Sequence, residues 1–203
     1  ATVYAATGSG NSIASGRISY TFGTHGPCIS VDTACSAALV ACREATKAVP
    51  ECGHALSVGA NLILSPVASD RFAVAGMTSP HGRSHTFDHR ADGYARAEAC
   101  CGVVVGELDR SLVVAGSALR QDGRSASLTA PSGQAQRSLI ITALADASVS
   151  VEELSLNEAH GTGTALGDPI EAGSLVASMR ADQLCTPELA GGVRREALLT
   201  FSG

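Results

Sequence analysis

The chain has 203 residues, with 14 lysines and arginines against 19 aspartates and glutamates, so its formal net charge is −5. Charged residues make up 16% and hydrophobic residues 45%, a composition that excludes a charged disordered chain and favours a folded core. The sequence has neither the lysine and arginine cluster that nucleic acid requires nor an apolar run near the ~20 residues of a membrane-spanning helix.

The sequence contains seven cysteines, an odd number, and no secretory signal is visible in it. We therefore expect reduced thiols and a cytoplasmic location, with a plastid left open if a transit peptide stood before Ala1. The absence of a C-x-x-C pair argues against zinc. His81, His85 and His89 are spaced as on one helix face, but Pro80 argues against a helix there. We expect no metal site.

The first part of the chain predicts alternating elements. In order, these are a helix over 11–20, a strand over 28–32, a helix over 37–49 closed by Pro50, and a strand over 55–60. The helix over 37–49 is apolar around its first two turns, which predicts burial. A strand, a tight turn, a buried helix and a strand in succession are typical of α/β proteins.

The second part of the chain begins with an irregular stretch over 65–98. Asp168 and Pro169 are placed as the cap and first residue of a helix. The other predicted elements are buried strands over 102–107 and 112–118, a loop over 121–134, a helix over 135–147, a strand over 154–158, a loop over 185–196 and a strand over 198–201.

Cys35 lies between the predicted strand over 28–32 and the predicted buried helix. At such a position, backbone N–H groups and the positive end of the helix dipole stabilise a thiolate. The small neighbours Ala34 and Ser36 leave room for a substrate, while Asp32 is expected to brace the turn. A buried structural cysteine is the alternative, and position alone does not decide between the two.

His160 begins a second candidate site, a loop of glycines and threonines that follows the strand over 154–158. Gly161 and Gly163 allow a ligand to approach the backbone closely, and Thr162 and Thr164 offer hydroxyl groups. A phosphate-binding loop is the alternative, but no GxxxxGK[ST] motif is present. Cys35 and His160 form a nucleophile pair only if the fold brings them together.

Several long motifs together resemble the β-ketoacyl synthase (ketosynthase) domain, most closely that of type I polyketide synthases. These motifs are GNSIASGRISYTFGTHGPC at 10–28, VDTACSAALVA at 31–41, SPHGRSHTFDHRADGYARAEACCGVVV at 79–105, GSALRQDGRSASLTAPSGQAQ at 116–136 and NEAHGTGTALGDPIEAGSL at 157–175. They occur in order over nearly the whole chain, which makes a chance resemblance negligible.

The resemblance implies an α/β, thiolase-like fold with layers α-β-α-β-α and two related halves, each with a mixed five-stranded sheet. It divides this chain into 1–110, the remainder of the N-terminal half with the nucleophile, and 111–203, the start of the C-terminal half. The domain is expected to be incomplete at both ends and to work as a homodimer.

The resemblance also implies an activity in polyketide or fatty-acid chain elongation. This activity is the decarboxylative Claisen condensation of an acyl thioester with a malonyl-type extender on an acyl carrier protein. Cys35 matches the acyl-accepting nucleophile, and His160 matches the histidine that assists decarboxylation and stabilises the enolate. Thr162 and Thr164 match the threonines that bind the phosphopantetheine arm, and Glu171 matches a buried carboxylate that organises the site. No bound cofactor is expected.

The sequence departs from the family pattern in ways that leave alternatives open. A lysine, a second histidine and a glycine-rich loop of the family are not found up to Gly203, so the fragment alone is expected to be inactive. Ala97 and Ala99 stand where the family has glycines, which could crowd a close backbone contact. The alternatives are a non-catalytic remnant or structural partner, and a thiolase-like condensing enzyme that uses coenzyme A.

Overall fold

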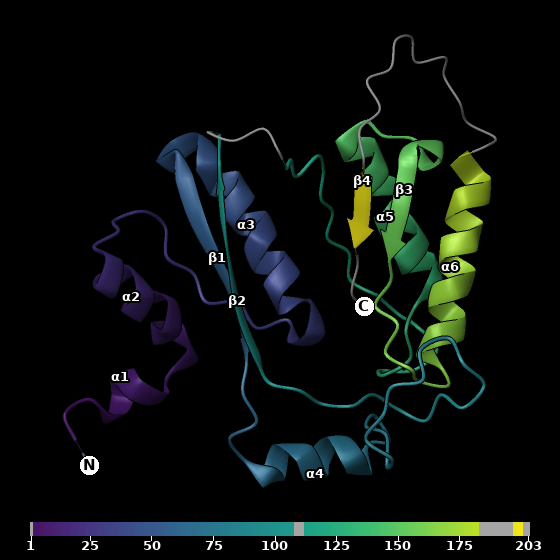
Figure 1. Cartoon of the computed structure of the whole chain (residues 1–203), viewed down its shortest axis with the longest axis horizontal. Helices are drawn as coiled ribbons and strands as arrows, with labels where there is room; N and C mark the ends of the chain where they lie inside the picture. The colour runs from purple at the N-terminus through teal and green to yellow at the C-terminus, as the bar shows by residue number, and fades with distance from the viewer. Residues whose placement is uncertain (1, 108–111, 183–196, 201–203) are drawn as a thin grey trace. The chain divides into compact units, whose positions relative to one another are not determined.

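The computed structural model describes residues 2–107, 112–182 and 197–200. Two compact units divide the chain: unit 1 holds Ala1–Ala60 and Ala99–Leu112, and unit 2 holds Asn61–Glu98 and Val113–Gly203. Figure 1 shows the helices and strands of each. The predicted division at 110/111 cuts the chain once, into two continuous parts. Unit 2 instead combines a segment before that point, Asn61–Glu98, with the segment Val113–Gly203 after it.

Unit 1 contains the helices α1 (Ala5–Ser9), α2 (Asn11–Phe22) and α3 (Ala37–Cys52), the short 3-10 helix η1 (Ala34–Ser36), and the strands β1 (His54–Asn61) and β2 (Ala99–Gly106). The two strands pair, and α3 packs against them. A Cβ atom at Gly59 would lie only 2.9 Å from the Cβ of Ala38. The start of α3 therefore approaches β1 closely because residue 59 has no side chain.

The predicted strand over 28–32 is wrong, because these residues form no ladder with any described part of the chain. The segment is tied to a helix instead. The Ser30 hydroxyl lies 2.9 Å from the Ser15 hydroxyl and accepts the Ser15 backbone N–H at 3.3 Å. The β-branched residues favour an extended backbone, but a strand also needs a hydrogen-bonded neighbour.

The helix predicted over 37–49 is present but extends past Pro50. Because Pro50 lies in the last turn, its missing N–H removes a single helical hydrogen bond near the end of the helix. Gly53, with φ 75°, then ends α3 by donating its N–H to the carbonyl of Val49 at 2.7 Å. The predicted burial is wrong within the described structure, since Ala45 is the one residue of α3 classed as buried.

Unit 2 contains the helices α4 (Pro66–Val74), α5 (Gly133–Ala147) and α6 (Gly167–Asp182), the 3-10 helix η2 (Val151–Glu153), and the strands β3 (Leu154–Glu158) and β4 (Ala197–Thr200). The strands β3 and β4 pair in parallel, and α5 packs against α6. Ile140 and Leu144 form the core of this unit, with Leu154 and Leu175 against them. The helix over 135–147 and the strand over 154–158 are confirmed.

The helix α4 corrects the prediction that residues 65–98 are irregular throughout. Pro66 occupies its first turn, a position that tolerates proline because the N–H there has no helical partner. Arg96 anchors the helix from a distant part of the sequence. Its guanidinium donates to the Ser69 hydroxyl at 2.7 Å and lies 5.0 Å from the centre of the Phe72 ring.

The strands predicted over 102–107 and 112–118 need two further corrections. The former exists as β2, but its side chains are largely exposed rather than buried. The described residues from 112 to 118 form no strand. The predicted loop over 185–196 lies outside the described residues, as do Cys185 and the end of the last predicted strand.

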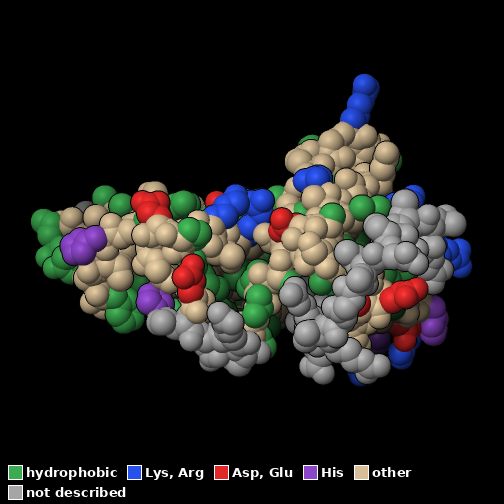
Figure 2. Space-filling model, turned by 90° about the horizontal axis from the view of Figure 1, so that it is seen from above, with side chains coloured by type: hydrophobic (Ala, Val, Ile, Leu, Met, Phe, Trp, Pro, Cys, Tyr) green, Lys and Arg blue, Asp and Glu red, His purple; other side chains and the backbone are tan. Residues whose placement is uncertain are grey.

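Hydrophobic side chains reach the surface at many positions, as the green atoms of Figure 2 show. On β2, for example, Val104 is 69% exposed. The six cysteines that the structure describes form no disulfide. Of the helices described, none has both the length and the apolar character that would be needed to span a membrane.

Candidate active site

Cys35 lies in the 3-10 turn that leads into α3 in unit 1. The residue before it, Ala34, has φ 53°, a left-handed conformation that is uncommon for a residue with a Cβ atom. Asp32 Oδ1 accepts the Ala34 N–H at 3.2 Å, and the Ser36 hydroxyl donates to the Thr33 carbonyl at 2.9 Å. The predicted bracing role of Asp32 is confirmed.

This geometry has a chemical consequence for Cys35. The residue is exposed and precedes the 16-residue helix α3. The N-terminal end of such a helix stabilises negative charge, which a thiolate or a developing oxyanion carries. The turn holds Cys35 at the surface, because the strained backbone of Ala34 cannot relax without breaking the hydrogen bonds of Asp32 and Ser36.

The histidine loop, residues 160–164, connects β3 to α6 in unit 2 (Figure 1). Glu171, on the first turns of α6, is 3% exposed and binds the start of this loop. One of its carboxylate oxygens accepts the N–H of His160 at 2.5 Å, and the other accepts the N–H of Gly161 at 2.8 Å. The carboxylate therefore fixes the backbone of His160, a half-buried residue.

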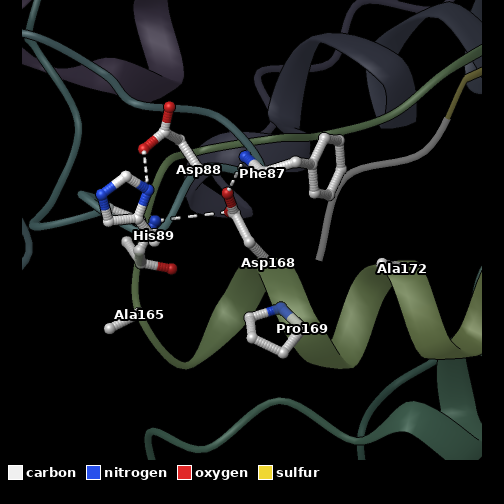
Figure 3. A pocket seen from close by; sticks show the side chains of 9 residues that line it. Phe87, Asp88, His89, Ala165, Asp168, Pro169 and Ala172 are labelled. Atoms are coloured by element: carbon white, nitrogen blue, oxygen red, sulfur yellow. Dashed lines mark hydrogen bonds and ion pairs between the residues drawn. The ribbon is translucent and has the colours of Figure 1, made fainter.

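Asp168 binds the remainder of the histidine loop. Its side chain is 4% exposed, and Oδ1 accepts the N–H groups of Gly163 at 3.0 Å and Thr164 at 3.3 Å. Oδ2 accepts the N–H of Phe87 at 2.6 Å, a contact drawn in Figure 3. Phe87 has φ 54° and Gly163 has φ 75°, so Asp168 binds the N–H groups of two residues with left-handed backbone conformations.

The prediction that Asp168 caps the next helix is wrong. The hydroxyl of Thr164 accepts the N–H of Gly167, the first residue of α6, at 3.1 Å. Thr164 thus has the capping function, because a threonine hydroxyl three residues before a helical N–H has the right reach. The Thr162 and Thr164 hydroxyls lie 3.2 Å apart, so they present a pair of polar groups beside the start of α6.

The segment 84–94 covers the carbonyl groups of the histidine loop. The Thr86 hydroxyl donates to the Gly161 carbonyl at 2.5 Å, and the Gly93 N–H donates to the Gly163 carbonyl at 2.9 Å. Gly163 has φ 75°, and a Cβ atom there would lie 2.8 Å from the backbone nitrogen of His85. The loop is therefore held by α6 through its N–H groups and by this segment through its carbonyls.

A cavity of about 350 Å³ opens beside Thr164 and the first turns of α6 (Figure 3). Its walls are mostly apolar and are formed by Phe87, Asp88, His89, Ala91, Thr164, Ala165, Asp168, Pro169 and Ala172. Asp88 forms an ion pair with Arg90 at 2.8 Å, and its Oδ1 atom lies 3.2 Å from Nδ1 of His89. Hydrogen bonds from the Arg90 side chain and backbone hold the pKa of the Asp88 carboxyl well below its usual range.

The structure brings four of the five predicted site residues together in unit 2: His160, Thr162, Thr164 and Glu171. Cys35 belongs to unit 1. Sequence reasoning missed the loop contacts of Asp168, although the D-P-I-E spacing on a helix start is a signal for paired carboxylates. It also missed Thr86, which lies 75 residues from Gly161 and has no local signal. The described residues hold no metal-binding group of three or more histidines, cysteines or acids.

Two family models match the chain in succession. The model for the N-terminal domain of β-ketoacyl synthases matches residues 1–111, and the model for the C-terminal domain matches residues 112–189.

Curated relatives include a phenolphthiocerol/phthiocerol polyketide synthase of Mycobacterium tuberculosis, 45% identical over 85% of this chain and 8% of the relative. The pikromycin polyketide synthase component PikAII of Streptomyces venezuelae is 44% identical over 86% of this chain and 5% of the relative. The chain therefore spans less than a tenth of the length of these two proteins.

Solved structures of similar fold are ketosynthase domains. The ketosynthase from module 6 of the bacillaene synthase of Bacillus subtilis 168 has a TM-score of 0.81 and 35% identity, over 87% of this chain and 34% of that one. The oxazolomycin ketosynthase domain OzmH KS7 of Streptomyces albus JA3453 has a TM-score of 0.80 and 34% identity, over 85% of this chain and 32% of that one. The expected α/β, thiolase-like fold class is confirmed. The chain belongs to the β-ketoacyl synthase family, and its relatives are polyketide synthases.

Proposed function

We propose that this chain carries catalytic residues of a ketosynthase that extends an acyl chain by decarboxylative Claisen condensation, with Cys35 as nucleophile. The observation that carries the proposal is the position of Cys35. It is exposed after the strained residue Ala34, in a braced turn at the start of α3, within a chain that belongs to the β-ketoacyl synthase family.

In the first half-reaction, the Cys35 thiolate attacks the carbonyl carbon of an acyl thioester on the phosphopantetheine arm of an acyl carrier protein. The new sulfur–carbon bond forms as the pantetheine sulfur leaves and takes up a proton, so one thioester replaces another. The tetrahedral intermediate carries an oxyanion, which backbone N–H groups at the start of α3 are suited to stabilise.

In the second half-reaction, a malonyl-type thioester loses its carboxylate as carbon dioxide, and the electron pair remains as an enolate. His160 donates a hydrogen bond to the enolate oxygen. The enolate carbon attacks the acyl group on Cys35, a carbon–carbon bond forms, and the Cys35 sulfur leaves. Because Glu171 fixes the His160 backbone, the imidazole keeps its position as charge develops.

The extender reaches this site on a pantetheine arm. Thr162 and Thr164 supply paired hydroxyls that suit the amide groups of such an arm. No redox step occurs, because decarboxylation supplies the electron pair, so we propose that the reaction needs no bound cofactor. The partners are an acyl carrier protein and a second copy of the protein in a homodimer. The relatives named above are bacterial and give the plastid alternative no support; the cytoplasm stays our prediction.

The test uses the protein that carries this sequence, at its full natural length. It is incubated with an acyl thioester on a carrier protein, then with a malonyl-type extender, and each product is followed by mass spectrometry. Cys35→Ala should abolish acyl loading and condensation. Cys42→Ala, which removes a thiol from α3 two turns further along, should retain both. Full condensation by Cys35→Ala would overturn the proposal.

The same assay decides between the proposal and its alternatives. Faster loading from an acyl coenzyme A than from an acyl carrier protein would instead support a thiolase-like enzyme. An intact, folded protein that takes up no acyl group on Cys35 from either donor would support a non-catalytic partner. Loading from the carrier protein followed by condensation supports the ketosynthase.

A further inference from the structure

We propose that Thr86 is a positioning residue for His160, acting through the carbonyl group of Gly161. The inference rests on the proposed function, since it assigns a residue to the second half-reaction. Thr86 lies in a part of the chain that has no regular secondary structure, between α4 and β2.

The hydrogen bonds around Gly161 show why its carbonyl oxygen needs a separate donor. The N–H groups of His160 and Gly161 both bind the carboxylate of Glu171, at 2.5 and 2.8 Å. A buried carboxylate fixes these two donors, but it cannot bind the Gly161 carbonyl, because a carboxylate only accepts hydrogen bonds. The Thr86 hydroxyl supplies the missing donor at 2.5 Å.

The methyl group of Thr86 adds a second contact. Gly161 has φ 53°, and a Cβ atom built on it would lie 2.6 Å from the Thr86 Cγ2 atom. The side chain of Thr86 therefore lies directly against the Gly161 backbone. Its hydroxyl and methyl groups together leave the residue after His160 little room to rotate away from its observed conformation.

The segment that carries Thr86 is itself tied to the same site. The Phe87 N–H binds Asp168 at 2.6 Å, and the Gly93 N–H binds the Gly163 carbonyl at 2.9 Å. Thr86 is thus attached directly to Phe87, which is one of the residues that Asp168 holds. Because the Thr86 hydroxyl binds the Gly161 carbonyl, a shift of this hydroxyl moves the peptide group that follows His160, the proposed enolate-binding residue.

The experiment compares Thr86→Val with Thr86→Ser in the natural-length protein, and measures acyl loading and condensation separately. Valine keeps the shape but removes the donor, so the kcat of condensation with a malonyl-type extender should fall about 3- to 10-fold. Loading of Cys35 should stay within about twofold, because His160 acts in the second half-reaction. Serine keeps the donor and should restore condensation to within about twofold of the unmodified protein.

Thr78→Val is the matched control, because Thr78 pairs with Tyr94 through the backbone instead of binding the histidine loop. Normal condensation by Thr86→Val would overturn the inference, as would an equal loss of condensation in Thr78→Val. If Thr86→Val does not fold, Thr86→Ser decides alone: it must retain condensation, and its loss would overturn the inference. Failure of the unmodified protein to load an acyl group would instead contradict the proposed function.

Discussion

The carboxylate of Glu171 accepts the backbone N–H of His160 at 2.5 Å and lies almost completely buried, at 3% exposure. Since its second oxygen accepts the Gly161 N–H, one side chain fixes two consecutive peptide units of the histidine loop. A glutamate on a helix thus determines where the preceding loop places its histidine.

Replacing this carboxylate tests the arrangement. In Glu171→Gln, one oxygen becomes an NH₂ group that faces a backbone N–H, and two charge-assisted hydrogen bonds become one neutral bond. We expect a loss of about 1.5–3 kcal/mol in the free energy of unfolding, measured by urea denaturation. Condensation should fall at least about tenfold, with a smaller effect on Cys35 loading.

Glu152→Gln serves as the control for Glu171→Gln, because Glu152 is exposed in η2. It should change neither the unfolding free energy by more than about 0.5 kcal/mol nor the rate of condensation. Equal effects of the two substitutions would show that the buried carboxylate has no special role.

The left-handed conformation of Ala34 predicts an unusual response to glycine. Ala34→Gly should leave the protein unchanged or stabilise it by up to about 1 kcal/mol, because glycine adopts φ 53° without strain. The same exchange at Ala41, inside α3, should destabilise it by about 1 kcal/mol. Urea denaturation of both variants measures the difference in sign.

The alkylation rate of Cys35 adds a second measurement on Ala34→Gly. A more mobile turn would expose the thiol for less time in its reactive position, so labelling by iodoacetamide should slow while the protein becomes no less stable. A destabilisation in Ala34→Gly equal to that in Ala41→Gly would contradict the strain at residue 34.

The pair formed by Asp88 and Arg90 predicts a pH dependence. The pKa of Asp88 is lowered below the value of an unfolded aspartate, about 3.9. The pair therefore stabilises the folded protein above about pH 4, and this contribution is lost as the pH falls through the folded-state pKa.

The measurement compares the unmodified protein with Asp88→Asn at several pH values by urea denaturation. The difference in unfolding free energy should be small, because the pair is at the surface, and it should shrink as the pH is lowered below about 4. Asp70→Asn on α4, which removes a carboxylate outside the ion pairs of the described residues, should show no comparable trend. A difference that grows on acidification would contradict the assignment.

Elements with strong local signals could be predicted from the sequence. The regular spacing of Leu139, Ile140 and Leu144 predicts α5, and the same residues form the core that buries it. The segment around Ser30 has the composition of a strand but forms none, because composition does not reveal whether a partner strand is present. α4 was missed because the prolines and glycines of 65–98 outweighed Pro66 as a helix start.

The candidate site shows the same division. Motifs identify Cys35 and His160, and the neighbouring site residues, such as Asp32 and Thr162, lie within a few positions of them in the sequence. Thr86 and Gly93 act on the histidine loop from far away in the sequence, and Asp168 binds backward to that loop instead of forward along its helix. These contacts depend on tertiary packing, which cannot be predicted from the hydrophobic periodicity of the sequence or from the capping preferences of its residues.

The spacing of Asp168 and Glu171 has a consequence for variation in this family. The two carboxylates lie within one turn of α6 and hold successive parts of the same loop. One inserted residue between them would rotate the second by about 100° around the helix axis and displace it along that axis. We expect length changes here to be incompatible with a working loop, so that natural variants alter the side chains around this interval but preserve its length.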